Sequence, residues 1–164
     1  MLTASVRDKI DEQIERTIHL IGLLPADNTG WTPPVADAWS VGLLLGHLLD
    51  CMAGFCAVLY RVHPQELAHF EALRELPVNQ VCAPEAACES IRMYRGHIHE
   101  GFDLLGDGDL GLKLPTIFVP QGETVLTLLL GNLEHLINHK HQLLMYLKLM
   151  GVTAGTPDLY RFRG

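Results

Sequence analysis

The sequence predicts an all-α protein: one domain over residues 1–164, folded as a four-helix bundle. Four long segments carry apolar residues at helical spacing, and no segment alternates apolar and polar residues over the length of a strand. A chain of 164 residues with 48% apolar content is also long enough to bury a substantial core. Two long connections, at 61–83 and 106–122, allow the bundle to depart from a simple up-down-up-down order.

The first helix is expected over residues 3–24. Its apolar residues recur every three or four positions, as in an amphipathic helix, and charged residues cover its other faces. Pro25 marks its end, because the residue before a proline disfavours helical geometry. A loop rich in turn-forming residues should follow, as far as Trp39.

The second helix is expected over residues 41–61, with Ser40 as its N-cap. A short extra helix fits between residues 64 and 76, where Pro77 would stop it. The third helix should run over 84–105, since Pro84 suits the first position of a helix.

The last helix is expected over residues 123–150 and should end at Gly151. Before it, residues 109–121 contain two prolines and are predicted to form an extended connector with a short pair of strands. After it, residues 152–164 show no periodic pattern and are predicted to be irregular.

Charge argues against a nucleic-acid partner. Nineteen acidic residues outnumber twelve basic ones, which gives a formal net charge of −7. No stripe of Lys and Arg interleaved with aromatic residues is present, and Arg161 and Arg163 alone make too short a basic tail. We therefore expect a small-molecule substrate and no nucleic acid.

Residues 41–60 are long and apolar enough to span a bilayer, but His47 and Asp50 lie near the middle of this segment. A central Asp costs about 2.5–3.5 kcal/mol on insertion, so the helix is better placed in the centre of a bundle than in a membrane. The N-terminus has no apolar stretch typical of a signal peptide, and the four cysteines form no C-x-x-C motif. These features predict a cytoplasmic protein with reduced thiols.

His135 and His139 form the clearest candidate for a metal site. Residues four apart on a helix share one face, close enough for two imidazoles to bind one ion. Gln142 and Tyr146 continue the same polar stripe along a helix that is otherwise rich in leucine. A spacing of four also arises by chance among nine histidines, so the pair needs a further partner.

His47 is the expected partner, since it lies in the most apolar helix of the chain. One alternative is a core histidine whose hydrogen bonds are satisfied by a carbonyl or by Asp50. Taken with the pair, His47 completes a set of three imidazoles with an open position, the arrangement of catalytic zinc sites. Imidazole also suits nickel, iron and copper, so the donor set alone leaves the metal open. Among these metals we expect zinc or nickel.

The remaining histidines are expected at the surface or rim, with His97 the one most able to turn toward the bundle centre. Cys51, one turn after His47, is a competing ligand or a small buried residue. Asp50 and Glu134 could orient a ligand imidazole or be ordinary solvated carboxylates. Gln142, Tyr146 and Asp50 are the candidate catalytic residues, which would orient a substrate or move protons.

Two segments of the sequence resemble the DinB/YfiT-like superfamily. Residues 39–48, WSVGLLLGHL, are similar to its W-S-x-x-E/L-x-x-x-H-L segment. Residues 135–151 are similar to its H-x-x-x-H, R-G-Q-L and Y-L-R-x-x-G signatures, and residues 120–124 to the P-x-G-x-T segment that leads into that helix. The sequence departs from the pattern at Lys140 and His141, where the family has Arg-Gly, and this could alter local packing or access to the metal. A leucine also occupies the position before the first ligand that is often Glu.

The resemblance implies a four-helix bundle, often a homodimer, with a divalent metal held by the residues that match His47, His135 and His139. It also implies two kinds of activity: transfer or isomerisation with a low-molecular-weight thiol such as mycothiol, bacillithiol or glutathione, or metal-dependent hydrolysis. A metal would bind a water or a thiol and lower its pKa. A non-catalytic metal-binding module and a pure dimerisation domain remain as alternatives.

Overall fold

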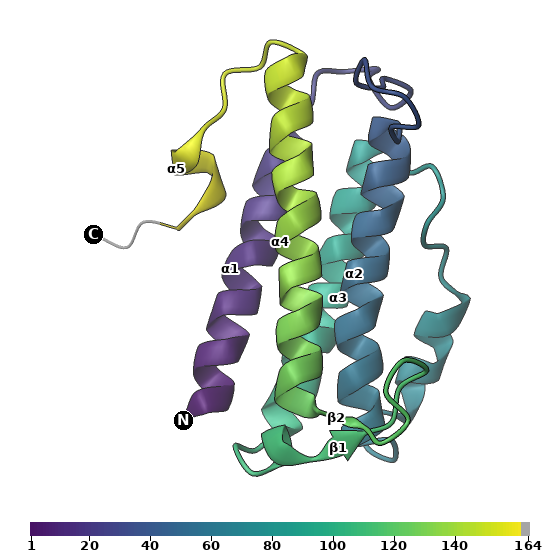
Figure 1. The fold of residues 1–164 in the computed structure, drawn as a ribbon, viewed down its shortest axis with the longest axis vertical. Helices are drawn as coiled ribbons and strands as arrows, with labels where there is room; N and C mark the ends of the chain where they lie inside the picture. Colours follow the sequence, from purple (N-terminus) through teal and green to yellow (C-terminus); the bar gives the residue numbers. More distant parts are fainter. Residues whose placement is uncertain (162–164) are drawn as a thin grey trace.

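The structure, a computed structural model, describes residues 1–161 and contains four long helices packed side by side (Figure 1). They are α1 (Leu2–Gly22), α2 (Val41–Val62), α3 (Pro84–Leu104) and α4 (Val125–Leu149). α2 packs against both α3 and α4, and α1 packs against the same two helices. The predicted all-α four-helix bundle is confirmed. Arg163, one of the two tail arginines, lies outside the described residues.

The helices run in an up-down-down-up order. α1 and α4 point in one direction and α2 and α3 in the other, because the connection between α2 and α3 returns along the length of the bundle (Figure 1). Two close contacts agree with this order. Gly101 near the end of α3 lies against Leu59 near the end of α2, whereas Asn132 of α4 meets Gly54 in the middle of α2. Thus α2 and α4 are antiparallel neighbours, and this pairing positions the histidines.

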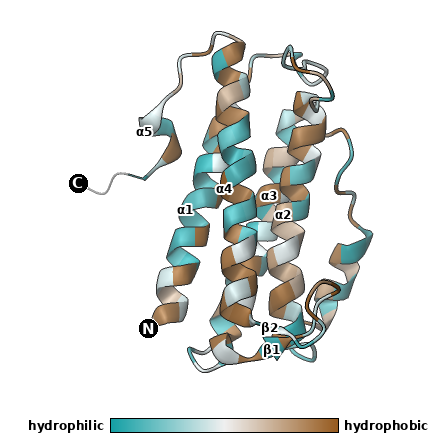
Figure 2. Cartoon of the chain, in the orientation of Figure 1, coloured by the Kyte–Doolittle hydropathy of each residue, from teal (hydrophilic) through white to brown (hydrophobic). Residues whose placement is uncertain are grey.

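α2 is the central helix of the core. By length and composition α2 could cross a membrane, but 67% of its 18-residue apolar window is buried inside the protein. Its apolar character along most of its length is visible in Figure 2. Ser40 caps its first turn by accepting a hydrogen bond from the Leu43 amide, as expected. Burial against α3 and α4 therefore accounts for the apolar residues.

The predicted short helix between α2 and α3 is present as a 3₁₀ helix, η1 (Ala68–Glu75). The predicted strand pair is also present, but only its first strand lies within residues 109–121. β1 (Lys113–Leu114) pairs antiparallel with β2 (Glu123–Thr124), and a one-turn 3₁₀ helix, η2 (Asp109–Gly111), precedes β1. The predicted start of the last helix, residue 123, belongs instead to β2. Thr124 caps α4 by accepting from the Thr127 amide.

The prediction of an irregular tail is wrong for one short segment, α5 (Thr156–Leu159). α5 packs against α1, and Asp158 lies 2.8 Å from the Nε2 of His19. The Arg161 side chain adds ion pairs to Asp11 and Glu15 of α1. Contacts with α1, which local periodicity does not reveal, therefore order this part of the tail.

Candidate metal centre

His47, His135 and His139 lie together at the contact between α2 and α4. The three ring centroids are 4.4 to 4.9 Å apart, and each pair of rings meets edge to face. One nitrogen from each ring lies within 4.8 Å of the others, and all three side chains are partly buried. The structure thus brings together the three imidazoles that the sequence singled out.

The closest pair of nitrogens is Nε2 of His47 and Nε2 of His135, which are 2.9 Å apart. The Nδ1 of His47 faces the Asn79 Oδ1 at 2.6 Å, and the Nδ1 of His139 faces the Gln142 Oε1 at 2.9 Å. Both amide oxygens are acceptors, so both Nδ1 atoms carry the proton and both Nε2 atoms keep their lone pairs. The unprotonated form is the one that binds metals.

Asn79 reaches His47 because the chain that precedes α3 lies directly on α2. The Asn79 amide donates to the Gly46 carbonyl at 3.0 Å, and the Cys82 amide donates to Gly42 at 3.0 Å. A Cβ on Gly46 would lie 1.7 Å from the Gln80 carbonyl oxygen, so only glycine permits this approach. Asn79 itself has a φ of 57°, a left-handed conformation that asparagine tolerates well.

The orientation of His139 is fixed by a directed chain of hydrogen bonds. The Tyr146 hydroxyl donates to the Trp39 carbonyl at 3.0 Å, and this carbonyl can only accept. The hydroxyl oxygen therefore accepts from the Gln142 Nε2 at 3.1 Å, which turns the Gln142 Oε1 toward His139. The chain thus fixes the proton of His139 on Nδ1.

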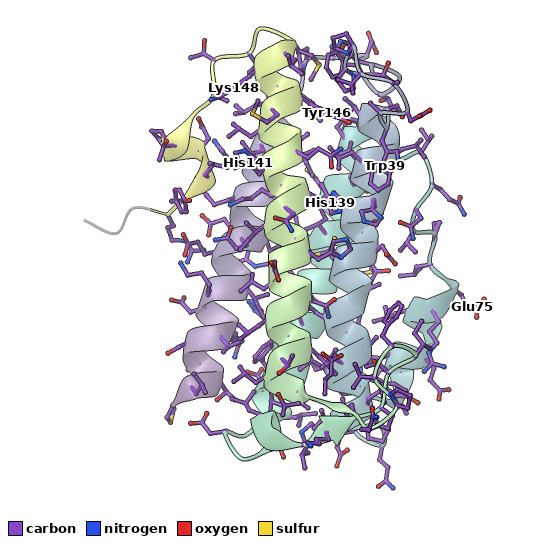
Figure 3. All side chains as sticks on the ribbon, in the orientation of Figure 1. Trp39, Glu75, His139, His141, Tyr146 and Lys148 are labelled. Carbon is purple, nitrogen blue, oxygen red and sulfur yellow. The ribbon has the colours of Figure 1, made fainter. Side chains whose placement is uncertain are left out.

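Trp39 also covers the site directly. Its indole stacks on His139 at 5.7 Å between centroids and meets the edge of His47 at 4.8 Å. Figure 3 shows Trp39 and His139 facing each other across the space between α2 and α4. His141, two residues further on, points to the opposite side of α4, toward α5 (Figure 3). The structure therefore separates His141 from the three-histidine cluster.

Cys51 lies on the far edge of His135 from the cluster. Its Sγ is 3.6 Å from the Nδ1 of His135, whereas the Nε2 of that ring faces His47. Burial raises the pKa of the Cys51 thiol to about 12, and the charge of Asp50 contributes to this rise. A protonated thiol on the Nδ1 side is positioned to contact the imidazole ring rather than to bind the same ion.

The electrostatics of the cluster suit a cation. Burial lowers the pKa of His135 and of His139 and so favours their neutral forms, although the hydrogen bond with Gln142 acts to raise that of His139. The Nε2 atoms of His47 and His135 are 2.9 Å apart, so that a proton or a metal ion must lie between them. The donor set therefore fits a divalent metal such as zinc or nickel.

Comparison with known proteins gives the family. The sequence model of the DinB superfamily matches residues 9–143. The chain belongs to the DinB superfamily. Its fold is similar to the crystal structure of a DinB-like protein, YjoA, from Bacillus subtilis, with a TM-score of 0.71 and 18% identity over 96% of this chain and 99% of that chain. A search of the curated proteins gave no match.

A cavity of about 290 Å³ adjoins the three-histidine cluster on the side of His135. It lies between α2, α4 and η1, and its apolar part includes Cys56 and Phe70. Its polar groups come from Asp50, Tyr60, Arg74, Asn132 and His135. A small molecule in this cavity would lie beside one imidazole of the cluster and within reach of both an acidic and a basic side chain.

The three predicted catalytic residues occupy different surroundings. Asp50 lines the cavity beside His135. Gln142 and the buried Tyr146 instead belong to the hydrogen-bond chain that begins at His139. Glu134, a candidate for orienting an imidazole, is exposed.

Sequence patterns did not reveal Asn79 as a partner of His47 and gave Trp39 no role in the site. Asn79 lies in a connector with no periodic pattern, and its position depends on Gly46, so no local signal identified it. Trp39 is part of the segment at residues 39–48 that resembles the family, and this resemblance was the one signal that could have identified it as a site residue.

The structure also explains the Lys-His pair that replaces the family's Arg-Gly. Lys140 is 3% exposed, and its Nζ donates to the Leu159 carbonyl at 2.9 Å and to the Gln13 Oε1. His141 is exposed. Lys140 thus joins α4 to α1 and α5, on the side of α4 away from the histidine cluster.

Proposed function

We propose that this DinB-superfamily protein is a metal-dependent enzyme that acts on a small molecule, with a divalent cation held by His47, His135 and His139. The observation that carries the proposal is the close approach of these imidazoles while separate side chains hold the Nδ1 atoms of His47 and His139. Ligand histidines in metalloproteins are commonly fixed by partners of this kind. Zinc or nickel is the proposed metal, since both suit imidazole donors.

Three imidazoles leave room for a further ligand, and a bound divalent ion would supply a Lewis acid that lowers the pKa of a water or a thiol. Within the proposal, Asp50 is the group beside the cavity that accepts a proton from the substrate. Gln142 and Tyr146 are positioning residues, because their hydrogen bonds hold His139 in place and are already satisfied. Arg74, at the cavity wall, would attract an anionic part of the substrate.

The cavity beside His135 favours an enzyme over a closed structural metal site. A structural zinc site has four protein ligands and no access for substrate. Here Cys51, the candidate fourth ligand, contacts the other edge of His135. The geometry therefore supports an open coordination position close to a cavity of small-molecule size.

Two reaction classes remain within the proposal. The family resemblance supports a transferase that uses a low-molecular-weight thiol, and the open three-histidine site equally supports a hydrolase. A panel of small electrophiles, tested with and without mycothiol, bacillithiol or glutathione, separates the two. Turnover that requires a thiol supports the transferase, and thiol-independent cleavage of an ester or amide supports the hydrolase.

The metal proposal is tested by elemental analysis and thermal unfolding of protein purified without a histidine tag. A bound metal raises the melting temperature because it stabilises only the folded state. We expect this rise with the native chain and with His141→Ala, the matched surface control, and a clearly smaller rise with His135→Ala and His139→Ala. Absence of bound metal together with absence of any metal-induced rise in the native chain would overturn the proposal.

A further inference from the structure

A second group of potential metal ligands lies outside the cluster described above. His69 is in η1, and His97 and Glu100 are one turn apart on α3. One donor atom from each of these side chains lies within 4.8 Å of the others. The three come from connections and helices that do not contribute to the His47 cluster, so this group is separate from it in both sequence and structure.

Glu100 is the centre of the second group. The Nε2 of His69 lies 3.0 Å from Oε1 and 3.1 Å from Oε2 of Glu100, and the Nδ1 of His97 lies 3.5 Å from Oε2. Phe70 packs edge-on against both imidazoles, with centroid distances of 5.0 and 5.1 Å. The aromatic ring thus contacts both imidazoles, and the carboxylate lies within 3.5 Å of a nitrogen of each.

The charge of Glu100 is not balanced by a strong base. Within residues 1–161, the ion pairs of Glu100 are with His69 and His97, and none is with Lys or Arg. When both imidazoles are neutral, the carboxylate lies between two neutral nitrogen donors. Two imidazoles and one carboxylate are a typical donor set for Zn²⁺.

We propose that His69, His97 and Glu100 form a second, peripheral binding site for a divalent cation of the zinc class. The proposal does not depend on the function of the His47 cluster. The ligands of this site join η1 to α3, and η1 supplies Phe70, Leu73 and Arg74 to the wall of the cavity beside His135. A cation bound here links η1 to α3 and so reduces local unfolding of η1.

Zinc titration of the untagged protein tests the proposal by stoichiometry. Zinc sulfate alone is the probe, and calorimetry counts the sites in four chains: native, Glu100→Gln, His47→Ala with His135→Ala, and His19→Ala as the control. We expect two equivalents of zinc per chain for the native protein and for the His19→Ala control. We expect one equivalent for Glu100→Gln and one for the chain with His47→Ala and His135→Ala. A native stoichiometry that Glu100→Gln leaves unchanged overturns the second site.

Amide hydrogen exchange over residues 68–75 adds a readout specific to η1. In the chain that carries His47→Ala and His135→Ala, zinc should slow exchange in this segment, and Glu100→Gln added to that chain should abolish the slowing. Because Glu100 is half-exposed, this substitution is expected to leave the fold intact. Exchange that zinc does not change would show that the group is a set of His–Glu ion pairs only. Loss of zinc at the His47 cluster alone would contradict the proposed function and leave this site standing.

Discussion

At the scale of single residues, two of the three histidines are oriented by side chains that are not themselves candidate metal ligands. Asn79 and Gln142 fix which nitrogen of His47 and of His139 carries the proton. If either amide is lost, the imidazole can rotate or exchange its proton between nitrogens, and the Nε2 lone pair is no longer held toward the cluster. The affinity of the site for metal should therefore depend on these amides.

Gln142→Ala should weaken metal binding by about 10–100-fold, the usual effect of losing a partner of a ligand histidine. The reason is the loss of the hydrogen-bond chain from His139 to Tyr146, while the three imidazoles remain. Asn138→Ala is the matched control, because Asn138 is exposed on the same helix. Competition titration with a chelator measures the affinities, and an unchanged affinity for Gln142→Ala would exclude the positioning role.

Lys140 predicts a distinct dependence of stability on pH. Burial lowers the pKa of Lys140 from 10.5 to about 8. Below pH 8 the folded state therefore carries the full free-energy cost of the buried charge. This cost disappears as the pH rises toward 10.5. The unfolding free energy of the native chain, relative to Lys140→Met, should rise by about 2 kcal/mol between pH 7.5 and pH 10.

Urea unfolding at several pH values measures this difference, and the comparison removes the contribution of groups shared by both chains. Lys148→Met, a change at an exposed lysine of the same helix, serves as the control for the loss of one lysine. A difference between the native chain and Lys140→Met that does not change with pH would show that the buried ammonium carries no penalty.

At the scale of the elements, the contact between α2 and the chain before α3 depends on one glycine. In Gly46→Ala, the new Cβ would overlap the Gln80 carbonyl, which is 1.7 Å away. We expect the segment around residue 79 to move away from α2, the chain to lose about 1–3 kcal/mol of unfolding free energy, and the metal affinity to fall because Asn79 leaves His47.

Gly96→Ala is a suitable control for this substitution, because the methyl group that it adds to a helix of the same bundle would have no neighbour within 4 Å. It should keep the metal affinity and gain slightly in helix stability. Thermal unfolding and chelator competition measure the two quantities. A Gly46→Ala chain with native affinity would mean that the connector is not needed to hold His47.

The contact between α1 and α3 is held by a partly buried carboxylate. Burial raises the pKa of Asp11, but Arg95 and His99 outweigh this effect and lower it to about 2. Arg95 contacts both carboxylate oxygens, at 2.6 and 2.8 Å, and His99 contacts one at 2.7 Å. A lowered pKa stabilises the fold above the ordinary value of 3.8, and this stability is lost as the pH falls toward 2.

Asp11→Asn should therefore cost about 2 kcal/mol at pH 7, and about half of that at pH 3. Asp103→Asn removes the more exposed ion pair between Arg7 and Asp103 at the same contact, and it should cost less than about 1 kcal/mol. Urea unfolding at the two pH values checks both changes. A cost for Asp11→Asn that does not vary with pH would show that the charge of Asp11 is not responsible.

At the scale of the whole molecule, the long helices were predictable because each carries its own apolar periodicity and its own boundaries. Ser40, Pro25 and Pro84 mark ends that the structure places within a few residues. The up-down-down-up order was harder to predict from the sequence, since it depends on the path of the 63–83 connector. α5 was not predictable for a similar reason, because it is ordered by contacts with α1 rather than by a pattern of its own.

The histidine cluster was predictable in part for physical reasons. His135 and His139 share a helix face by spacing alone, and His47 is conspicuous in an apolar helix. The partners of these imidazoles depend on tertiary contacts that have no sequence signal, as Asn79 shows. A homodimer and a cytoplasmic location stay predictions.

The central claim is that one divalent ion is bound by His47, His135 and His139. Anomalous diffraction at the zinc edge, from crystals of the untagged protein grown with zinc, tests it most directly. We expect a strong peak about 2.0–2.1 Å from the Nε2 atom of each of the three imidazoles, the usual Zn–N distance. A peak bonded to the Sγ of Cys51, or no peak among these imidazoles, would contradict it.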